Sequence, residues 1–409
     1  MTREPLVMTA KDEDLLGVSN RSDAMGVLAI WSVRGRDLIP HLTAQTTHVQ
    51  GFQILVEAFR LWELYESEHP QHAGRLDDFF LLVEQAFART VGARDKDWLL
   101  PGSRRVRARM TEDPHISLSD PGWHLLGGQK ANGLWGLYRG AARRAGLLAK
   151  NIMRLSDETE KHASSQPGIR TNVQARLFDV VAPAMDGNTE ALPNHMNNKL
   201  TASIYNTYWE VPLANHLHAR LVDGHDLNRQ LAQRLLDLDE LEHRTFLDKA
   251  ARELPEHRAA IEGVVHCENL LAVVEAIFLW LCASKGRRLD EVVVDLPVNL
   301  SDLARARTDF AHSGTYRDGT ARDRHRLFCE KLDTSTAAAL ARSVLLLHKE
   351  VSKTRGQASW VWEDQGILCS DMELEPPTDV EFQVGLAWRN DYYLTPLKAI
   401  AKGLAERCE

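Results

Sequence analysis

The segment from His257 to Ala283 reads HRAAIEGVVHCENLLAVVEAIFLWLCA. Its apolar side chains recur at steps of three and four residues, a spacing that gathers them on one face of a helix. This stripe consists of Ile261, Val264, Cys267, Leu271, Val274, Phe278 and Leu281. The longest uninterrupted apolar run, Ala276–Ala283, has only eight residues, whereas a helix that spans a bilayer needs about 20. The pattern predicts a buried core helix of a soluble protein without membrane contact.

The same spacing occurs twice within residues 22–100. One stripe comprises Phe52, Leu55, Val56, Phe59 and Trp62, and a second comprises Phe79, Leu82, Val83 and Phe87. The first pattern stops at Pro70, which cannot continue a helix interior, and the second helix is expected from about Leu76 to Thr90. The two stripes predict a helical hairpin.

Strand patterns are few and short. Val292–Val294 is a β-branched run that favours a strand. A β-hairpin is predicted at about residues 358–374, where two apolar runs flank a turn that contains Gly366. An amphipathic helix is expected from about Tyr392 to Glu406. The predicted fold class is therefore mainly α, a multi-subdomain helical protein with short β-hairpins near the C-terminus.

Shifts in composition suggest three segments. An arginine-rich stretch begins after Pro101, and a polar connector follows at 161–171. We predict an N-terminal helical domain at 1–100, a basic segment at 101–171, and a C-terminal helical domain at 172–409 that contains the small hairpin.

Overall composition excludes several classes of protein. Of 409 residues, 44% are hydrophobic and 26% charged, which is ordinary for a globular chain and excludes a disordered or collagen-like one. Five scattered cysteines without a Cys-x-x-Cys pair indicate neither a disulfide framework nor a zinc knuckle. Residues 1–20 carry four acidic side chains and no apolar core, so no secretory signal is predicted. A cytoplasmic protein is expected.

Common catalytic motifs are absent. The chain has no G-x-x-x-x-G-K-[ST], no G-x-G-x-x-G after a strand, no G-x-S-x-G and no H-E-x-x-H. These absences argue against a sequence-local enzyme site, and no cofactor is predicted.

Charge is distributed unevenly along the chain. Residues 101–176 hold 13 Lys and Arg against 6 Asp and Glu, a net charge of +7. Since the whole chain carries −8, the other residues carry −15. Cationic side chains that reach phosphates displace condensed counterions, which is the source of non-specific nucleic-acid affinity. The candidate nucleic-acid-binding residues are Arg104, Arg105, Arg107, Arg139, Arg143, Arg144 and Lys150.

Arg139 and Arg143 are four residues apart, so they share a helical face. With Gly127-Gly128 as the turn, this segment is expected to form a helix-turn-helix whose second helix carries the arginines. Gly136, Gly140 and Gly146 are each costly inside a helix and point to close approach of another backbone. The alternative is that these arginines pair with the acidic remainder of the chain or with a protein partner.

The sequence offers two candidate metal sites, and solvent-exposed helix faces are the alternative interpretation. Glu66–His69 and Glu240–His243 match Glu-x-x-His, the spacing of di-iron helical bundles. His69, however, directly precedes Pro70, at a helix end. Asp295 follows the predicted strand, as a carboxylate of a magnesium-dependent nuclease would, but a second converging acid is missing. No metal site is predicted.

The preferred hypothesis is a non-catalytic adaptor or subunit of a larger bacterial complex, associated with nucleic acid, for example in anti-phage defence. Other protein subunits are the expected partners, together with DNA or RNA bound through residues 101–176. One alternative is a metal-dependent nuclease that uses Asp295. The other is a protein–protein scaffold without nucleic-acid contact.

Overall fold

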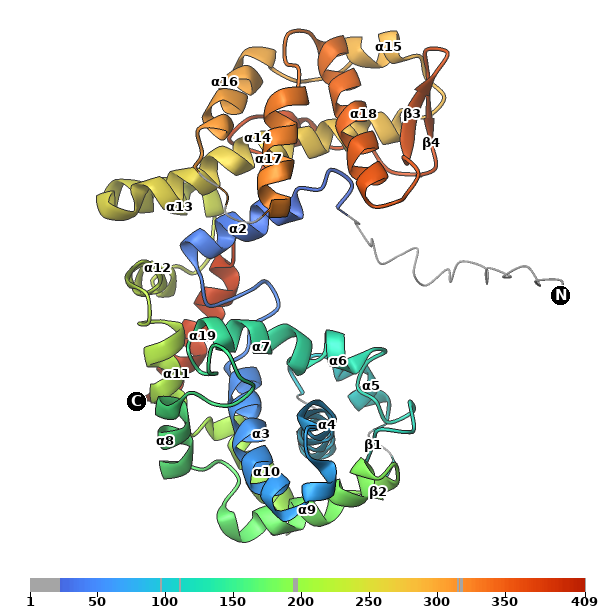
Figure 1. Cartoon of the computed structure of the whole chain (residues 1–409). Coiled ribbons are helices and arrows are strands. Elements are labelled where there is room, and N and C mark those ends of the chain that lie inside the picture. The colour runs from blue at the N-terminus through green and yellow to red at the C-terminus, as the bar shows by residue number, and fades with distance from the viewer. Residues whose placement is uncertain are drawn as a thin grey trace, which may run out of the picture. The chain divides into compact units, whose positions relative to one another are not determined.

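The computed structural model describes residues 23–95, 98–109, 112–193, 198–314, 316 and 319–408. α-Helices make up most of this part of the chain, and two small antiparallel sheets complete it (Figure 1). The mainly α fold class is therefore confirmed. Residues 1–20, for which no secretory signal is predicted, lie outside the described residues.

The chain divides into two compact units. Unit 1 comprises residues 1–34 and 247–390, and unit 2 comprises residues 35–246 and 391–409. The three segments expected from composition do not coincide with these units, because the boundaries predicted at 100/101 and 171/172 both fall inside unit 2. Composition changes there without any break in the packing.

Unit 2 is built around a helical hairpin. Helix α3 (Val49–Glu68) is followed by the short 3₁₀ helix η1 (Pro70–His72) and by α4 (Leu76–Asp95), so the predicted hairpin is confirmed, with α4 about a turn longer than expected. Trp62 and Phe79 lie in contact across it, with ring centroids 5.4 Å apart. The remaining helices of this unit are α5 (Ser103–Ala108), α6 (Gln129–Asn132), α7 (Leu134–Arg144), α8 (Asp157–Ser165), α9 (Thr171–Met185), α10 (Lys199–Glu210), α11 (Ala214–Leu221), α12 (Asp226–Leu236) and α19 (Leu394–Cys408).

Helix α4 lies at the centre of unit 2 (Figure 1). It contacts α3, α5, α6, α7, α9 and α10. Consequently every residue from Leu82 to Val91 is buried, including the charged Glu84 and Arg89. The sequence predicted a single buried stripe on this helix, whereas the fold surrounds it.

A small sheet of unit 2 has no counterpart in the sequence predictions. Strand β1 (His115–Ser117) pairs antiparallel with β2 (Thr189–Ala191), with Ile116 opposite Glu190. Three-residue strands that are distant in sequence leave no period-two pattern, so sequence reasoning could not find them.

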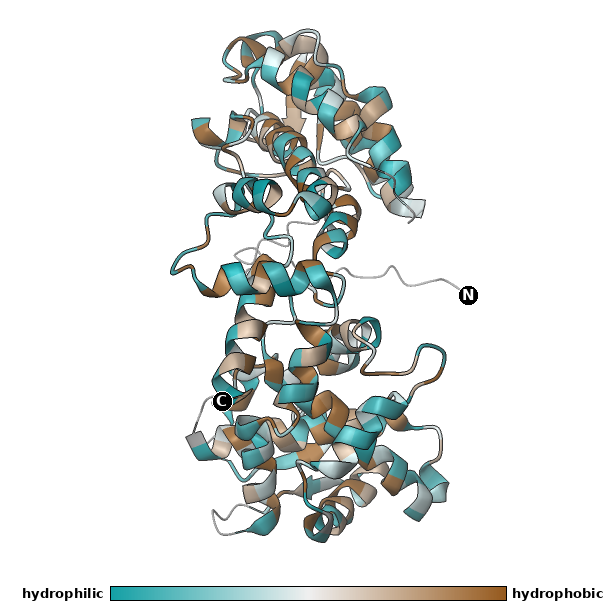
Figure 2. Ribbon diagram, turned by 90° about the vertical axis from the view of Figure 1, so that its left-hand side faces the viewer, coloured by the Kyte–Doolittle hydropathy of each residue, from teal (hydrophilic) through white to brown (hydrophobic). Residues whose placement is uncertain are grey.

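Unit 1 is organised by α14 (Arg258–Ala283), the helix predicted from the opening segment. The stretch from Pro255 to Ala283 is long and apolar enough to cross a membrane, but 72% of its most apolar window is buried inside the fold. Hydrophobic and hydrophilic residues alternate around the helices in Figure 2. The same unit contains α16 (Leu300–Ala311), α17 (Gly319–Lys331), α18 (Ala337–Thr354), η2 (Pro255–His257) and η3 (Asp379–Phe382). The unit boundaries at 34/35 and 246/247 fall within α2 (Leu28–Leu38) and α13 (His243–Glu253).

The prediction of a strand at Val292–Val294 is wrong. These residues end helix α15 (Leu289–Val294), which contacts α18 and whose buried residues are Leu289 and Val292. A spacing of three places those two side chains on one helical face, and Val294 is 82% exposed. Tertiary packing thus overrides the β-propensity of valine.

The C-terminal hairpin is confirmed. Strand β3 (Val361–Asp364) pairs with β4 (Ile367–Ser370). The two turn residues, Gln365 and Gly366, both have positive φ, at 49° and 82°, as a two-residue type I′ hairpin turn requires.

Candidate functional site

The arginines of α5 lie on the surface of unit 2. Arg104, Arg105 and Arg107 are all exposed. Arg105 donates to the carbonyl oxygens of Pro121 (3.5 Å) and His124 (3.3 Å), and Arg107 donates to Ser103 Oγ (3.2 Å). These contacts leave the positive charges of all three side chains facing solvent.

The arginines of α7 are held by neutral groups. Arg139 lies over the Trp135 ring, 4.7 Å from its centroid, and Arg143 contacts Met153 Sδ at 2.6 Å. Arg144 donates to the Pro40 carbonyl oxygen at 2.7 Å. Cation–π and carbonyl contacts fix the geometry of a guanidinium without neutralising it.

In the part of the chain that the structure describes, none of the seven predicted binding residues has a carboxylate partner. Elsewhere in the same segment Lys130 pairs with Asp77, Arg109 with Glu112 (3.2 Å) and Arg154 with Asp157 (3.2 Å). The seven cations are Arg104, Arg105, Arg107, Arg139, Arg143, Arg144 and Lys150. None of these seven charges is therefore neutralised by a direct ion pair within the described chain.

The predicted helix-turn-helix is not formed. No helix directly precedes Gly127, since residues 112–128 contain turns, loop and strand β1. The four-residue α6 instead adjoins α7 at Gly133. Gly136 confirms the expected close approach, because a Cβ there would lie 1.9 Å from the Ala131 carbonyl oxygen of α6.

A buried carboxylate fixes the start of α7. Glu84 of α4 is 0% exposed and accepts hydrogen bonds from Leu134 N (2.8 Å) and Gln129 Nε2 (2.9 Å). Burial raises the pKa of Glu84 to about 7, although both hydrogen bonds favour the ionised form. The carboxylate satisfies an otherwise unpaired amide at the helix N-terminus. It thereby positions the helix that carries Arg139 and Arg143.

A cationic cluster lies beneath α5. The guanidinium groups of Arg89 and Arg109 lie 5.3 and 4.4 Å from the centroid of the Trp123 ring. Arg89 also donates to the Arg105 and Trp123 carbonyl oxygens. Burial, with Arg109 nearby, lowers the pKa of Arg89 to about 10. Since Arg109 pairs with Glu112, the buried Arg89 is the residue that extends the positive charge of α5 into unit 2.

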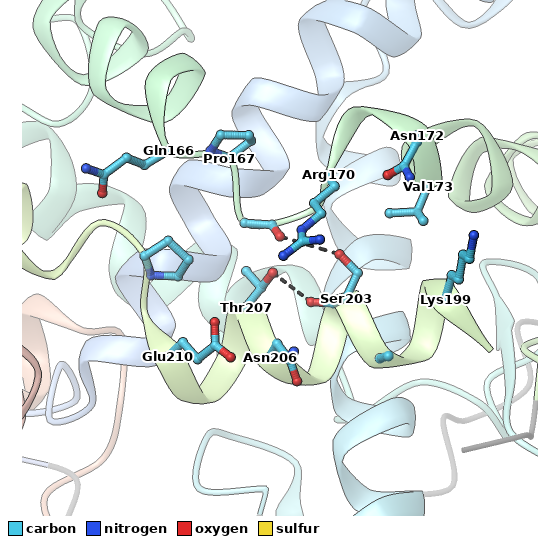
Figure 3. A pocket seen from close by; sticks show the side chains of 13 residues that line it. Gln166, Pro167, Arg170, Asn172, Val173, Lys199, Ser203, Asn206, Thr207 and Glu210 are labelled. Carbon is cyan, nitrogen blue, oxygen red and sulfur yellow. Dashed lines mark hydrogen bonds between the residues drawn. The ribbon is translucent and has the colours of Figure 1, made fainter. Parts of the chain in front are cut away.

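A polar cavity of about 560 Å³ opens between α10, the loop at 166–170 and the start of α9 (Figure 3). Ser203 Oγ donates to the Gly168 carbonyl oxygen at 3.4 Å across its wall. Its charged lining residues are Arg170, Lys199 and Glu210. The sequence did not predict this cavity, because its lining comes from segments some thirty residues apart, with no motif in either.

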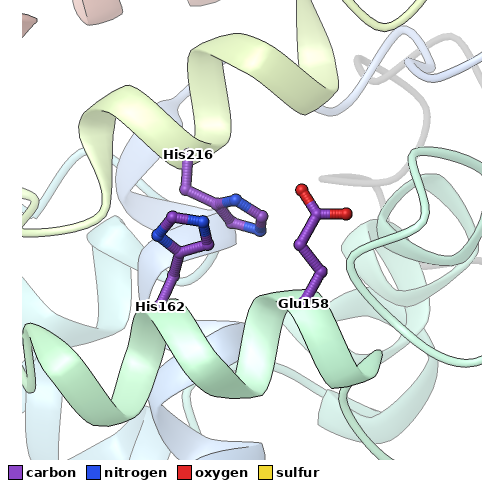
Figure 4. A group of neighbouring side chains, drawn as sticks. All are labelled: Glu158, His162 and His216. Carbon is purple, nitrogen blue, oxygen red and sulfur yellow. The ribbon is translucent and has the colours of Figure 1, made fainter.

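Three metal-ligating side chains converge between α8 and α11 (Figure 4). Glu158 and His162 come from α8 and His216 from α11, and their potential ligand atoms all lie within 4.8 Å of one another. Burial, with His162 nearby, lowers the pKa of His216 to about 4. The Glu-x-x-His pattern does not mark this group, because Glu158 and His162 are four residues apart.

The structure does not support the two metal sites suggested by the sequence. Neither Glu66–His69 nor Glu240–His243 belongs to a metal-competent group among the described residues. Asp295 follows a helix rather than a strand and pairs with Arg287 at 2.5 Å. The nuclease alternative therefore loses the strand on which it depended.

Comparison with protein-family models, curated proteins and solved structures finds no match to this chain.

Proposed function

We propose that this chain is a non-catalytic subunit that binds nucleic acid through the basic segment, residues 101–176. The observation that supports the proposal is the set of seven cations without carboxylate partners in the described part of the chain. A surface that held these arginines for internal ion pairs would show acidic side chains beside them, as Lys130 and Arg154 do.

Neutral contacts suit the arginines of α7 to phosphate binding. Arg139 stacks on Trp135 and Arg143 contacts Met153, so part of the side-chain entropy is lost before a ligand arrives. A guanidinium held in this way keeps its charge, and the N–H groups that these contacts leave unused can donate to a phosphate oxygen. Each such contact would release condensed counterions from the nucleic acid.

In this proposal the chain works in the cytoplasm, within a larger complex whose other subunits supply any catalysis. A bacterial setting and a role in anti-phage defence stay predictions from the sequence.

The test is charge reversal on one helix, with fluorescence anisotropy of labelled duplex DNA and single-stranded RNA at low salt. Arg139→Glu combined with Arg143→Glu should abolish binding of the nucleic acid that the parent binds. The matched control is Arg305→Glu combined with Arg326→Glu, which changes the charge equally at arginines that contact acidic residues. Binding by the α7 variant that equals the parent's would refute the proposal and favour a protein-only scaffold.

A further inference from the structure

The group between α8 and α11 combines two imidazoles with one carboxylate. Glu158 and His162 are separated by four residues on α8, so both side chains leave the same face of that helix. His216 meets them from α11. Both helices belong to unit 2, so one compact unit supplies all three groups.

His216 is oriented by its surroundings. It is 6% exposed, and its Nε2 lies 3.0 Å from Thr159 Oγ1, next to Glu158 in the sequence. Thr159 Oγ1 in turn lies 2.8 Å from Ser156 Oγ, the N-cap of α8. A hydrogen bond on one ring nitrogen fixes the imidazole and directs the other nitrogen to a ligand, as in known metal sites.

The other two groups can adjust to an ion. Glu158 and His162 are exposed, and the His162 and His216 rings lie 4.4 Å apart at 25°. Arg220 contacts Glu158 Oε2 at 3.4 Å, which leaves the second carboxylate oxygen for coordination. The potential ligand atoms of the three residues now lie within 4.8 Å of one another. Side-chain rotations would bring each of them to about 2.0–2.2 Å from a shared zinc ion.

We propose that Glu158, His162 and His216 bind a divalent transition-metal ion, with zinc as the natural occupant. Two nitrogen ligands and one carboxylate oxygen suit Zn²⁺ rather than Mg²⁺ or Ca²⁺, which prefer oxygen ligands. Water would complete a tetrahedral shell. The ion would link α8 to α11 and so stabilise unit 2.

The experiment is calorimetric titration of the metal-free full-length chain with zinc chloride, alongside three variants. The parent should bind zinc, and His162→Ala should lose one equivalent. Thr159→Val, which removes the hydroxyl that orients His216, should weaken that site by roughly 10- to 100-fold. The matched control, His218→Ala, removes a histidine of the same helix that contacts Asp223 instead, and should bind zinc as the parent does.

Thermal unfolding provides an independent measurement. Zinc should raise the melting temperature of the parent and of His218→Ala but not of His162→Ala, because a ligand that binds only the folded state stabilises it. Melting without zinc shows that each variant folds. The proposal is overturned if the parent binds no zinc, if His162→Ala binds as many equivalents as the parent, or if His218→Ala loses the same site.

Discussion

Glu84 is a carboxyl group that has no cation beside it among the described residues. Its neighbours are the amides of Leu134 and Gln129, in the fully buried centre of unit 2. The ionised form is stabilised by these donors and destabilised by loss of water, and the second effect is larger because the pKa rises to about 7.

The contribution of Glu84 to stability should therefore fall as the pH rises between about 4.5 and 7. In this window the folded chain retains a proton on Glu84 that the unfolded chain has released, so folding becomes less favourable by about 3 kcal/mol in total. Urea unfolding of the parent and of Glu84→Gln across this window measures the effect. The variant should lack this contribution, and the exposed control Glu68→Gln should keep it. Parallel pH curves for the parent and Glu84→Gln would contradict this account.

Two glycines of α7 should respond in opposite ways to alanine. A Cβ at Gly136 would lie 1.9 Å from the Ala131 carbonyl oxygen, whereas one at Gly140 would meet only the end of Arg144, at 3.5 Å. Gly140→Ala should stabilise the protein by up to about 1 kcal/mol through helix propensity. Gly136→Ala should lower the melting temperature, because α6 and α7 must separate. Equal shifts in thermal unfolding would show that no close approach exists at Gly136.

Helix α18 is joined to the rest of unit 1 through a buried histidine. His348 Nδ1 donates to the Ala24 carbonyl oxygen at 2.9 Å, and its Nε2 accepts from Trp360 N at 2.8 Å. Both contacts require the neutral ring, and burial lowers the pKa of His348. This one side chain ties α18 to the segment before α2 and to the start of the β3–β4 hairpin.

Acid should weaken these contacts. Below about pH 6.5 the unfolded chain takes up a proton that the folded His348 resists, so its contribution to stability is present above this pH and lost as the pH falls. His348→Gln should flatten this part of the pH profile of thermal unfolding and cost about 1–3 kcal/mol at neutral pH, since one amide group cannot donate to Ala24 and accept from Trp360 N at the same time, as the imidazole does. His312→Gln, at an exposed position, is the control. An unchanged acid profile in His348→Gln would rule out this role.

Periodicity predicted the elements that have one buried face. The stripes of α3 and α14 are regular, and the structure places helices at both. Periodicity failed where packing determines the secondary structure. Val292–Val294, for example, is helical because of its contact with α18. On α4, periodicity predicted the apolar stripe but not the burial of Glu84 and Arg89. That burial depends on the helices packed around α4, which the sequence of α4 alone does not identify.

The candidate sites also differ in how much of each can be predicted from the sequence. The charge asymmetry of residues 101–176 is a property of the sequence, and the structure adds that seven of its cations lack acidic partners among the described residues. The polar cavity and the Glu158–His162–His216 group combine helices that lie apart in the sequence. No local sequence motif marks the cavity or the Glu158–His162–His216 group, since the segments that form each site show no recognisable pattern on their own.

Considered as one particle, the protein carries −8 overall, so any attraction to nucleic acid must come from a confined surface. Affinity should then fall steeply as salt rises, because each phosphate contact at this surface releases condensed counterions from the nucleic acid. If the arginines of α5 and α7 supply about four phosphate contacts, affinity should fall roughly 100-fold between about 50 and 200 mM salt.

The most direct measurement is the slope of log affinity against log salt for the parent and for Arg139→Gln combined with Arg143→Gln. Each phosphate contact removed should reduce the slope by about 1, so the double variant should lose about 2 while its melting temperature stays close to the parent's. Binding that is salt-independent, or a slope that is equal in the two proteins, would contradict the claim that this basic segment binds nucleic acid.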